Sequence, residues 1–168
     1  ESGRACVVVV NKWDAISDKD DRLYKRTRDD LRAKLSPVAW ASSIFVSAKT
    51  GSRAGQIFDA IDATAAMHRR RTSTSVVNEV LEDAVRWQRP PATSTGRQGT
   101  VYYAAQVSTR PPTVVIFCND PKLFGNSYRR YLESQFRKAL GFEGTPLRML
   151  FRARSTRRRS AAAGETLS

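Results

Sequence analysis

Cysteine and histidine are scarce in this sequence and are not clustered. Cys6 and Cys118 are its two cysteines and His68 is its one histidine, with no Cys-x-x-Cys spacing and no histidine beside either thiol. This pattern argues against a disulfide scaffold and against a zinc-type metal centre. Since each cysteine lies in an apolar, strand-like run, we expect both to be buried, reduced thiols.

Long apolar runs and a balancing number of acidic residues are also missing. No segment approaches the roughly 20 apolar residues that a membrane-spanning helix needs, and no signal-peptide pattern opens the chain. Lysine and arginine number 29 against 16 aspartates and glutamates, which gives a formal net charge of +13. We therefore expect no membrane partner and an attraction to polyanions, with RNA the leading candidate.

The most informative segment that is present is 7–14, Val-Val-Val-Val-Asn-Lys-Trp-Asp. Its apolar half is typical of a parallel strand buried on both faces. Its polar half resembles the Asn-Lys-x-Asp motif with which P-loop GTPases recognise guanine. A carboxylate at Asp14 can accept hydrogen bonds from N1–H and the exocyclic amine of guanine, and adenine offers neither donor.

A second strand-like run, 43–46, is followed by Ser47-Ala48-Lys49, which resembles the second guanine-binding loop of the same enzymes. The resemblance implies that Asn11 ties its loop to the phosphate loop and that the Lys12 and Lys49 stems cover the two faces of the base. It also implies that Ser47 and Ala48 shape the loop, with the Ala48 N–H meeting guanine O6. The alternative is a polar turn after a strand, with Asp14 opening a loop.

Helical patterns follow both of these strands. Apolar residues recur at helical spacing from Ile16 to Leu35, before Pro37, and again from Ile57 to about His68. The order strand, helix, strand, helix predicts parallel strands joined by crossover helices.

The remainder predicts a second α+β unit. Ser73 and its neighbours can cap a helix that ends at Trp87, and 100–108 and 113–118 predict an antiparallel hairpin. A turn at 119–121, one helical turn at 121–124, a helix at 127–140 capped by Gly141 and a strand at 146–152 complete the order α-β-β-short α-α-β. The tail from Ser155 is rich in Arg, Ser and Ala, and we expect it to be disordered.

Four motifs in this second half, together with the two loops above, resemble the Der (EngA) GTPases. They are Arg-Pro-Pro-Thr at 110–113, Asn-Asp-Pro-Lys-Leu-Phe at 119–124, Tyr-Arg-Arg-Tyr-Leu-Glu at 128–133 and Gly-Phe-Glu-Gly-Thr-Pro-Leu-Arg at 141–148. That family is similar in having two tandem GTPase domains and a KH-like domain, and it acts in assembly of the large ribosomal subunit. The resemblance implies an α/β chain with the C-terminal part of a second GTPase domain at 1–71, a small α+β KH-like domain at 72–154 and a basic tail at 155–168.

The resemblance also sets expectations for cofactors and partners. The chain starts at Glu1 and contains neither GxxxxGK[ST] nor DxxG, so we expect a fragment that contacts only the guanine end of GTP or GDP. Without those motifs phosphoryl transfer has no basis, and the Mg²⁺ ligands of the complete protein are not in this chain. The implied partners are rRNA of the large subunit and the upstream GTPase domains, in bacterial cytoplasm or plastid stroma.

Basic residues are the candidate rRNA contacts, and for any one of them a solvated position on a helix face is the simpler alternative. They are Arg129, Arg130, Arg137, Lys138, Arg152, Arg154, Arg157, Arg158 and Arg159. The position of the usual KH Gly-x-x-Gly loop has a single glycine, Gly125, and we expect the glycines of 141–144 to serve a helix end and a turn. We expect the tyrosines at 102, 103, 128 and 131 to pack in the core rather than stack on bases. A standalone RNA-binding module and a domain that docks only protein are the alternative functions.

Overall fold

The computed structural model describes residues 2–17, 20–92 and 96–154. In chain order the elements are β1 (Val7–Val10), η1 (Trp13–Ala15), α1 (Asp21–Lys34), η2 (Ser36–Val38), β2 (Ser42–Phe45), α2 (Gln56–Arg69), α3 (Thr74–Trp87), β3 (Val101–Thr109), β4 (Pro112–Cys118), η3 (Pro121–Leu123), α4 (Asn126–Leu140) and β5 (Arg148–Ala153). The mixed helices and strands confirm the predicted α/β class. The predicted basic tail lies outside the described residues.

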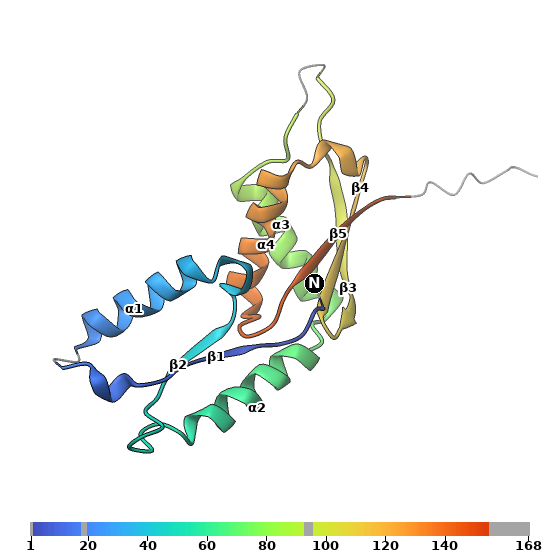
Figure 1. Ribbon diagram of the computed structural model, residues 1–168. Helices are drawn as coiled ribbons and strands as arrows, with labels where there is room; N and C mark the ends of the chain where they lie inside the picture. Colours follow the sequence, from blue (N-terminus) through green and yellow to red (C-terminus); the bar gives the residue numbers. More distant parts are fainter. Residues whose placement is uncertain (1, 18–19, 93–95, 155–168) are drawn as a thin grey trace, which may run out of the picture.

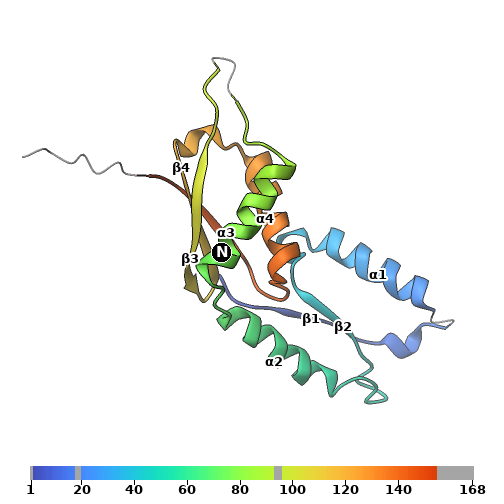
Figure 2. The ribbon, with the colours of Figure 1, turned by 180° about the vertical axis from the view of Figure 1, so that it is seen from behind.

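The first part of the chain forms a two-stranded parallel sheet, β1-β2, with Val7 opposite Ser42 and Val10 opposite Phe45. The helices α1 and α2 lie on opposite sides of these strands (Figures 1 and 2). The parallel pairing confirms the prediction from the alternating pattern. The first helix begins later than predicted, at Asp21, because Asp20 caps it by accepting a 2.6 Å hydrogen bond from the Leu23 N–H.

Burial of β1 on both faces was expected and is wrong for these residues. Val9 is 43% exposed, and Cys6, just before the strand, is only half-buried rather than buried. The physical reason is that β1 has one paired neighbour, β2, so part of its surface has no described residues packed over it.

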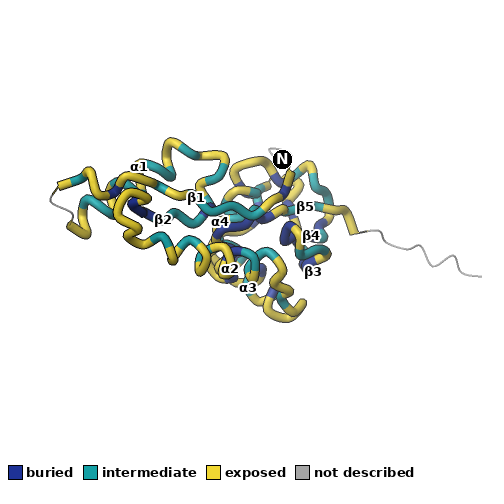
Figure 3. The backbone as a smooth tube through the Cα atoms, turned by 60° about the horizontal axis from the view of Figure 1, so that its bottom comes forward, coloured by how far each residue is buried: buried dark blue, intermediate teal, exposed yellow. Residues whose placement is uncertain are grey.

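The second part forms a three-stranded sheet in the order β3-β4-β5. Strands β3 and β4 are antiparallel and β4 and β5 are parallel, which confirms the predicted hairpin and the predicted order of elements. Helices α3 and α4 cover one face of this sheet (Figure 1). Buried residues are concentrated along α3, α4 and β4, where the tube is dark blue (Figure 3). Val77, Leu132 and Phe136 are among them.

Two tyrosines of α4 fasten it to the end of α3. The Tyr128 hydroxyl donates to the Gln88 carbonyl at 2.9 Å and the Tyr131 hydroxyl donates to the Ala84 carbonyl at 2.7 Å. Ala84 lies in the last turn of α3, where its carbonyl also accepts the Gln88 N–H at 3.0 Å, and Gln88 is the residue that follows the helix. Burial raises the pKa of Tyr128 to about 12 and also raises the pKa of Tyr131. Their packing was predicted correctly.

The two parts meet at the loop that follows α4. The Cys6 N–H donates to the Gly144 carbonyl and the Gly144 N–H donates to the Trp40 carbonyl, both at 2.8 Å. Nearby, Thr145 is fully buried and its Oγ1 lies 2.7 Å from Nδ1 of His68. Main-chain hydrogen bonds therefore join this loop to the segments that precede β1 and β2.

The link between α2 and α3 is held by one buried side chain, Gln106 of β3. Its Oε1 accepts a hydrogen bond from the Thr72 N–H at 2.7 Å, and its Nε2 donates to the Arg70 carbonyl at 2.9 Å and the Ser108 carbonyl at 3.2 Å. Gln106 is 6% exposed. One amide thus satisfies polar backbone groups of the link and of its own strand.

Candidate functional site

The two predicted guanine-binding loops lie side by side at the carboxyl ends of β1 and β2. The Val46 N–H donates to the Val10 carbonyl at 2.9 Å, and the Trp13 N–H donates back to the Val46 carbonyl at 3.0 Å. The parallel pairing of the strands therefore continues one step beyond their ends and delivers residues 11–14 and 47–49 to one edge of the sheet. This is the edge at which ligands bind in open α/β sheets.

Asn11 bridges the two loops through its side chain. Its Oδ1 accepts hydrogen bonds from the Ala48 N–H at 3.0 Å and from the Lys12 N–H at 2.7 Å. Lys12 adopts the left-handed backbone conformation, with φ of 64°, an uncommon conformation for a residue with a side chain. This residue directly precedes the short helix η1.

Ser47 makes the second bridge. Its Oγ donates to Oδ1 of Asp14 at 2.5 Å and accepts from the Thr50 N–H at 3.2 Å. The serine is 2% exposed, whereas Asp14 is exposed. A buried hydroxyl thus orients a carboxylate that stays accessible at the edge of the loop.

Trp13 fixes the first loop by packing its ring in the interior, a role that the sequence interpretation missed. It is 7% exposed and its ring lies 4.5 Å from that of Phe45 and 6.2 Å from that of Tyr24. A signal for this role was present in the sequence. Trp13 is a large apolar residue between Lys12 and Asp14, two polar residues that must stay exposed to contact a base. Beside it, a cavity of about 390 Å³ is lined by Trp13, Asp20, Asp21, Tyr24, Ser52 and Arg53. Neither Asp14 nor the two lysines line this cavity, so we do not assign it to the base.

One expected contact stays a prediction. The Ala48 N–H, expected to meet guanine O6, donates to Asn11 in this structure, so contact with O6 requires that bond to be shared or broken. Lys12 and Lys49 are exposed, as residues that cover a base must be. The arrangement brings all six predicted residues into two adjoining loops: Asn11, Lys12, Asp14, Ser47, Ala48 and Lys49.

Two arginines among the candidate rRNA contacts bind the chain's own backbone instead of extending from an exposed face. Arg129 donates to the Phe124 carbonyl at 2.7 Å and the Pro121 carbonyl at 2.8 Å. Arg137 donates to the carbonyls of Phe142 and Thr145, each at 3.0 Å. Both guanidinium groups therefore fix the loops that flank α4, and the expectation that they lie on its exposed face is wrong.

The other candidate contacts divide into exposed and undescribed residues. Arg130 and Lys138 are exposed on α4, and Arg152 and Arg154 are exposed at the end of β5. Arg157, Arg158 and Arg159 lie outside the described residues. Sequence periodicity could not separate Arg129 and Arg137 from Arg130 and Lys138, because the carbonyls they bind belong to loops whose paths the helical pattern does not specify.

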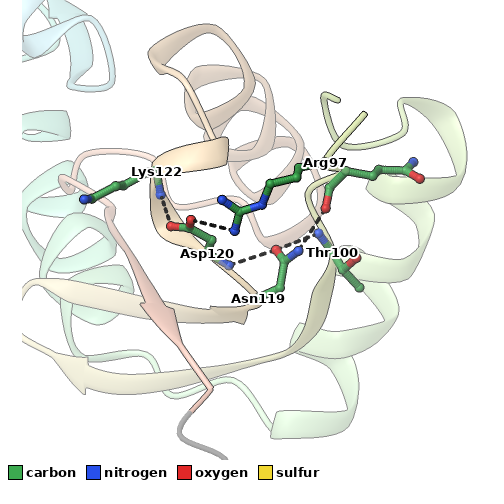
Figure 4. Close-up of polar contacts among 6 residues, drawn as sticks. Arg97, Thr100, Asn119, Asp120 and Lys122 are labelled. Atoms are coloured by element: carbon green, nitrogen blue, oxygen red, sulfur yellow. Dashed lines mark hydrogen bonds and ion pairs between the residues drawn. The ribbon is translucent and has the colours of Figure 1, made fainter. Parts of the chain in front are cut away.

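The Asn-Asp-Pro motif at 119–121 organises a loop, as Figure 4 shows. Asn119 Oδ1 accepts from the N–H groups of Thr100 and Asp120 at 3.0 and 2.8 Å, and its Nδ2 donates to the Gln98 carbonyl at 2.8 Å. Asp120 caps η3 through the Lys122 N–H at 3.0 Å, and an Arg97 guanidinium nitrogen lies 3.4 Å from its Oδ2. These motif residues connect the end of β4 to the start of β3.

The glycines of 141–144 have structural positions, as expected. Gly141 ends α4 in the left-handed conformation with φ of 63°, and Gly144 lies against Thr64 with φ of 75°. Gly125, at the place of the usual KH loop, precedes the first residue of α4. A KH-type backbone clamp with paired glycines is therefore not formed by either segment.

The described residues set two further limits. Among them, no group of three or more His, Cys, Asp or Glu side chains is placed to hold a metal ion. No helix within these residues combines the length and the apolar character needed to cross a bilayer.

Comparisons with known proteins give a consistent family assignment. Residues 71–152 match the family described as the C-terminal KH-domain-like domain of EngA bacterial GTPase enzymes. The protein named GTPase Der of Gloeobacter violaceus is 58% identical over 156 residues, 93% of this chain and 34% of that protein. GTPase Der of Thermosynechococcus vestitus is 54% identical over 94% of this chain and 35% of its own length.

The chain therefore spans about a third of the length of the curated relatives it matches. The family model and these relatives together confirm the resemblance found in the sequence motifs. Residues 71–152 form the KH-like domain of the EngA family, and the chain as a whole matches the C-terminal part of the Der (EngA) GTPases.

Proposed function

We propose that this chain supplies the guanine-recognition loops and the KH-like domain of a GTP-binding protein that acts in assembly of the large ribosomal subunit. The observation that carries the nucleotide part is the pair of side-chain bridges between the loops, Asn11 to Ala48 at 3.0 Å and Ser47 to Asp14 at 2.5 Å. They hold an accessible carboxylate in a defined orientation at the carboxyl end of a parallel strand pair. The names of the relatives support GTP as the nucleotide.

Specificity for guanine follows from the acceptor chemistry of Asp14. An ionised carboxylate only accepts hydrogen bonds, and the Watson–Crick edge of guanine offers two adjacent donors, N1–H and the 2-amino group. A base without both donors would leave a carboxylate oxygen desolvated and unpaired, which costs about 1–3 kcal/mol or more. The exposed Lys12 and Lys49 stems would enclose the two faces of the base.

GTP hydrolysis is part of the proposal only for the longer protein. The 168 residues contain no GxxxxGK[ST] and no DxxG, the motifs that hold the phosphates and Mg²⁺ in P-loop enzymes. We assign no step of phosphoryl transfer and no Mg²⁺ ligand to the residues described above. The chain alone is expected to bind guanine nucleotides weakly, through the base.

The nucleotide proposal is tested by replacing the carboxylate of Asp14 with an amide. In the longest natural polypeptide that contains this chain, Asp14→Asn presents an amide that can donate to the 2-oxo group of xanthine while accepting from N1–H. We expect the ratio of GTP to XTP affinity to reverse, measured by calorimetric titration of both nucleotides. Asp29→Asn, on the exposed side of α1, is the matched control. An unchanged GTP preference in the Asp14 variant would remove this residue from the base contact.

The ribosomal proposal is tested separately by sedimentation. The same polypeptide is mixed with purified 50S subunits and with 30S subunits, with GTP or GDP present. We expect it to sediment with 50S subunits more strongly in GTP. Equal sedimentation with both subunits in both nucleotides would contradict the assignment.

Because the named relatives are cyanobacterial, we include bacterial cytoplasm or plastid stroma in the proposal.

A further inference from the structure

The three-stranded sheet has a second face, turned away from α3 and α4. Along β5 the side chains alternate: Met149 and Phe151 pack against the core, whereas Arg148, Leu150 and Arg152 are exposed. Both helices lie on the same side of the sheet in opposite views (Figures 1 and 2). No helix among the described residues covers the other side. Thr113 and Val115 of β4 are nevertheless buried there, at 7% and 1% exposure, so the exposed part of this face is formed by side chains around them.

An aromatic pair occupies this second face. Tyr103 of β3 and Phe117 of β4 are opposite each other in the strand register, and their rings stack with centroids 4.4 Å apart and an interplanar angle of 19°. Arg152 of β5 is opposite Phe117 on its other side. Tyr103, Phe117 and Arg152 thus form a row of cross-strand neighbours over β3, β4 and β5. Tyr103 remains 39% exposed.

A second aromatic–arginine pair lies beside this row. The Arg154 guanidinium is 5.4 Å from the centroid of the Tyr102 ring, and Tyr102 is 47% exposed. The expectation that both tyrosines pack in the core is wrong. The register shift between Val101 and Tyr103 inserts an extra residue in β3, so simple alternation cannot predict where either ring lies.

The charged residues of the three strands have one sign, although Tyr102 also lines a cavity with Glu82 of α3. None of the three strands contains an aspartate or glutamate, whereas β5 carries two arginines, Arg148 and Arg152, and Arg154 follows directly. Aromatic residues and arginine are also enriched at protein–protein interfaces, so it is the surplus of positive charge that favours a polyanion here. Here, guanidinium groups accompany exposed aromatic rings, which is the combination that single-stranded nucleic acids select: rings for stacked bases and cations for phosphates.

We infer that this open sheet face, defined as Tyr102, Tyr103, Phe117, Leu150, Arg152 and Arg154, binds single-stranded RNA. Bases stack on the exposed tyrosine rings, and Arg152 and Arg154 bind the adjacent phosphates. The inference deepens the proposed ribosomal role and rests on it, and it places the RNA contact away from the exposed α4 residues Arg130 and Lys138. An unpaired rRNA segment, rather than a duplex, is the matching ligand, because only unstacked bases can reach a flat aromatic surface.

The test uses fluorescence anisotropy with the 168-residue chain and labelled oligoadenylate of about 12 nucleotides, alongside an RNA duplex of equal length, over a series of KCl concentrations. We expect Tyr103→Leu to weaken oligoadenylate binding about tenfold, with the slope of log K against log salt unchanged. Tyr103→Phe keeps the ring and should bind as the wild type does. Arg152→Gln should weaken binding and lower the salt slope by about 1.

Val107→Ala, at another exposed apolar position of β3, is the matched control for Tyr103→Leu, and Arg130→Gln on α4 is the control for Arg152→Gln. Thermal unfolding by circular dichroism verifies that each variant is folded. Wild-type affinity in Tyr103→Leu, equal weakening of the duplex, or dependence on Arg130 in place of Arg152 would overturn the inference. None of these results would change the expected outcome of the 50S sedimentation test, so the proposed function would stand independently of this inference.

Discussion

The Ser47 hydroxyl donates a 2.5 Å hydrogen bond to the Asp14 carboxylate, although the two residues are 33 positions apart. The bond joins a buried donor to an exposed acceptor, so the orientation of the carboxylate depends on a residue that the nucleotide need not touch. Hydrogen bonds to charged groups contribute about 1.5–3 kcal/mol.

Removing this donor should therefore weaken guanine binding without abolishing it. In the longest natural polypeptide that contains this chain, we expect Ser47→Ala to lower GDP affinity roughly tenfold, since 1.4 kcal/mol is a factor of ten. Titration with a fluorescent GDP analogue measures the effect. Ser52→Ala, exposed in the same loop, should leave the affinity unchanged. Equal affinities in the two variants would separate Ser47 from guanine recognition.

Gly144 is the position where a methyl group should do most harm. A Cβ there would collide with Oγ1 of Thr64 and lie 2.8 Å from its Cγ2, at a φ of 75° that already disfavours side chains. We expect Gly144→Ala to destabilise the chain by about 2–4 kcal/mol, from overpacking plus backbone strain. Urea unfolding followed by circular dichroism measures the loss.

Gly141→Ala separates the two causes of this loss. Its φ is 63°, but nothing lies within 4 Å of the added Cβ, so only backbone strain remains, about 1 kcal/mol. Thr64→Ala combined with Gly144→Ala should recover part of the stability by removing the clash. Equal losses for the two glycine variants, or no recovery in the double variant, would show that the contact with Thr64 is unimportant.

His68 should make stability depend on pH in the acidic range. Burial, followed by the positive charges of Arg110 and Arg69, lowers the pKa of His68 from its usual value of 6.5. The folded state therefore favours the neutral ring, and this contribution is complete above pH 6.5 and is lost as the pH falls through the folded pKa. We expect the free energy of unfolding to decline as the pH falls below 6.5.

Urea unfolding between about pH 5 and pH 7.5 checks this dependence. His68→Gln keeps a polar group near Thr145 Oγ1 but does not titrate, so the part of the decline due to His68 should disappear. Thr145→Ser, which keeps the hydroxyl, should retain the decline. An identical pH profile in wild type and His68→Gln would rule out the histidine as its source.

Gln106 should be difficult to replace because its amide serves three backbone groups. In Gln106→Leu the Thr72 N–H and the Arg70 carbonyl lose partners at 2.7 and 2.9 Å. Each polar group left buried and unpaired costs about 1–3 kcal/mol, so we expect a loss of about 2–4 kcal/mol in thermal or urea unfolding. Gln98→Leu, exposed outside the sheet, is the control and should change stability by less than about 0.5 kcal/mol.

The elements that could be predicted from sequence are those with a strong period or a clear stop. The helix of 127–140 and the hairpin strands were placed within one or two residues of α4, β3 and β4. The proximity of the loops at 11–14 and 47–49 also follows from the predicted parallel strands, because parallel strands end at the same edge. These features depend on local patterns and on general rules of chain connection.

Contacts between side chains and backbone groups of two separate segments could not be predicted, because they depend on the backbone conformation of both. The Ser47–Asp14 bond joins two loops, one of which has a left-handed backbone angle at Lys12, and sequence spacing contains no signal for that angle. In the same way, Arg129 and Arg137 face carbonyls of loops that only the folded chain brings near α4. The exposure of Tyr103 depends on a bulge whose position alternation cannot locate.

Strand β1 connects the loop of residues 11–14 to the KH-like half of the chain. Its last residue, Val10, leads directly into Asn11, while Cys6, just before its first residue, is hydrogen-bonded to Gly144 of the KH-like loop. At about 3.3 Å per residue the strand is a stiff strut of roughly 13 Å. We therefore expect a rotation of the loop at 11–14 to move the segment before β1, and with it the hydrogen bond from the Cys6 N–H to the Gly144 carbonyl.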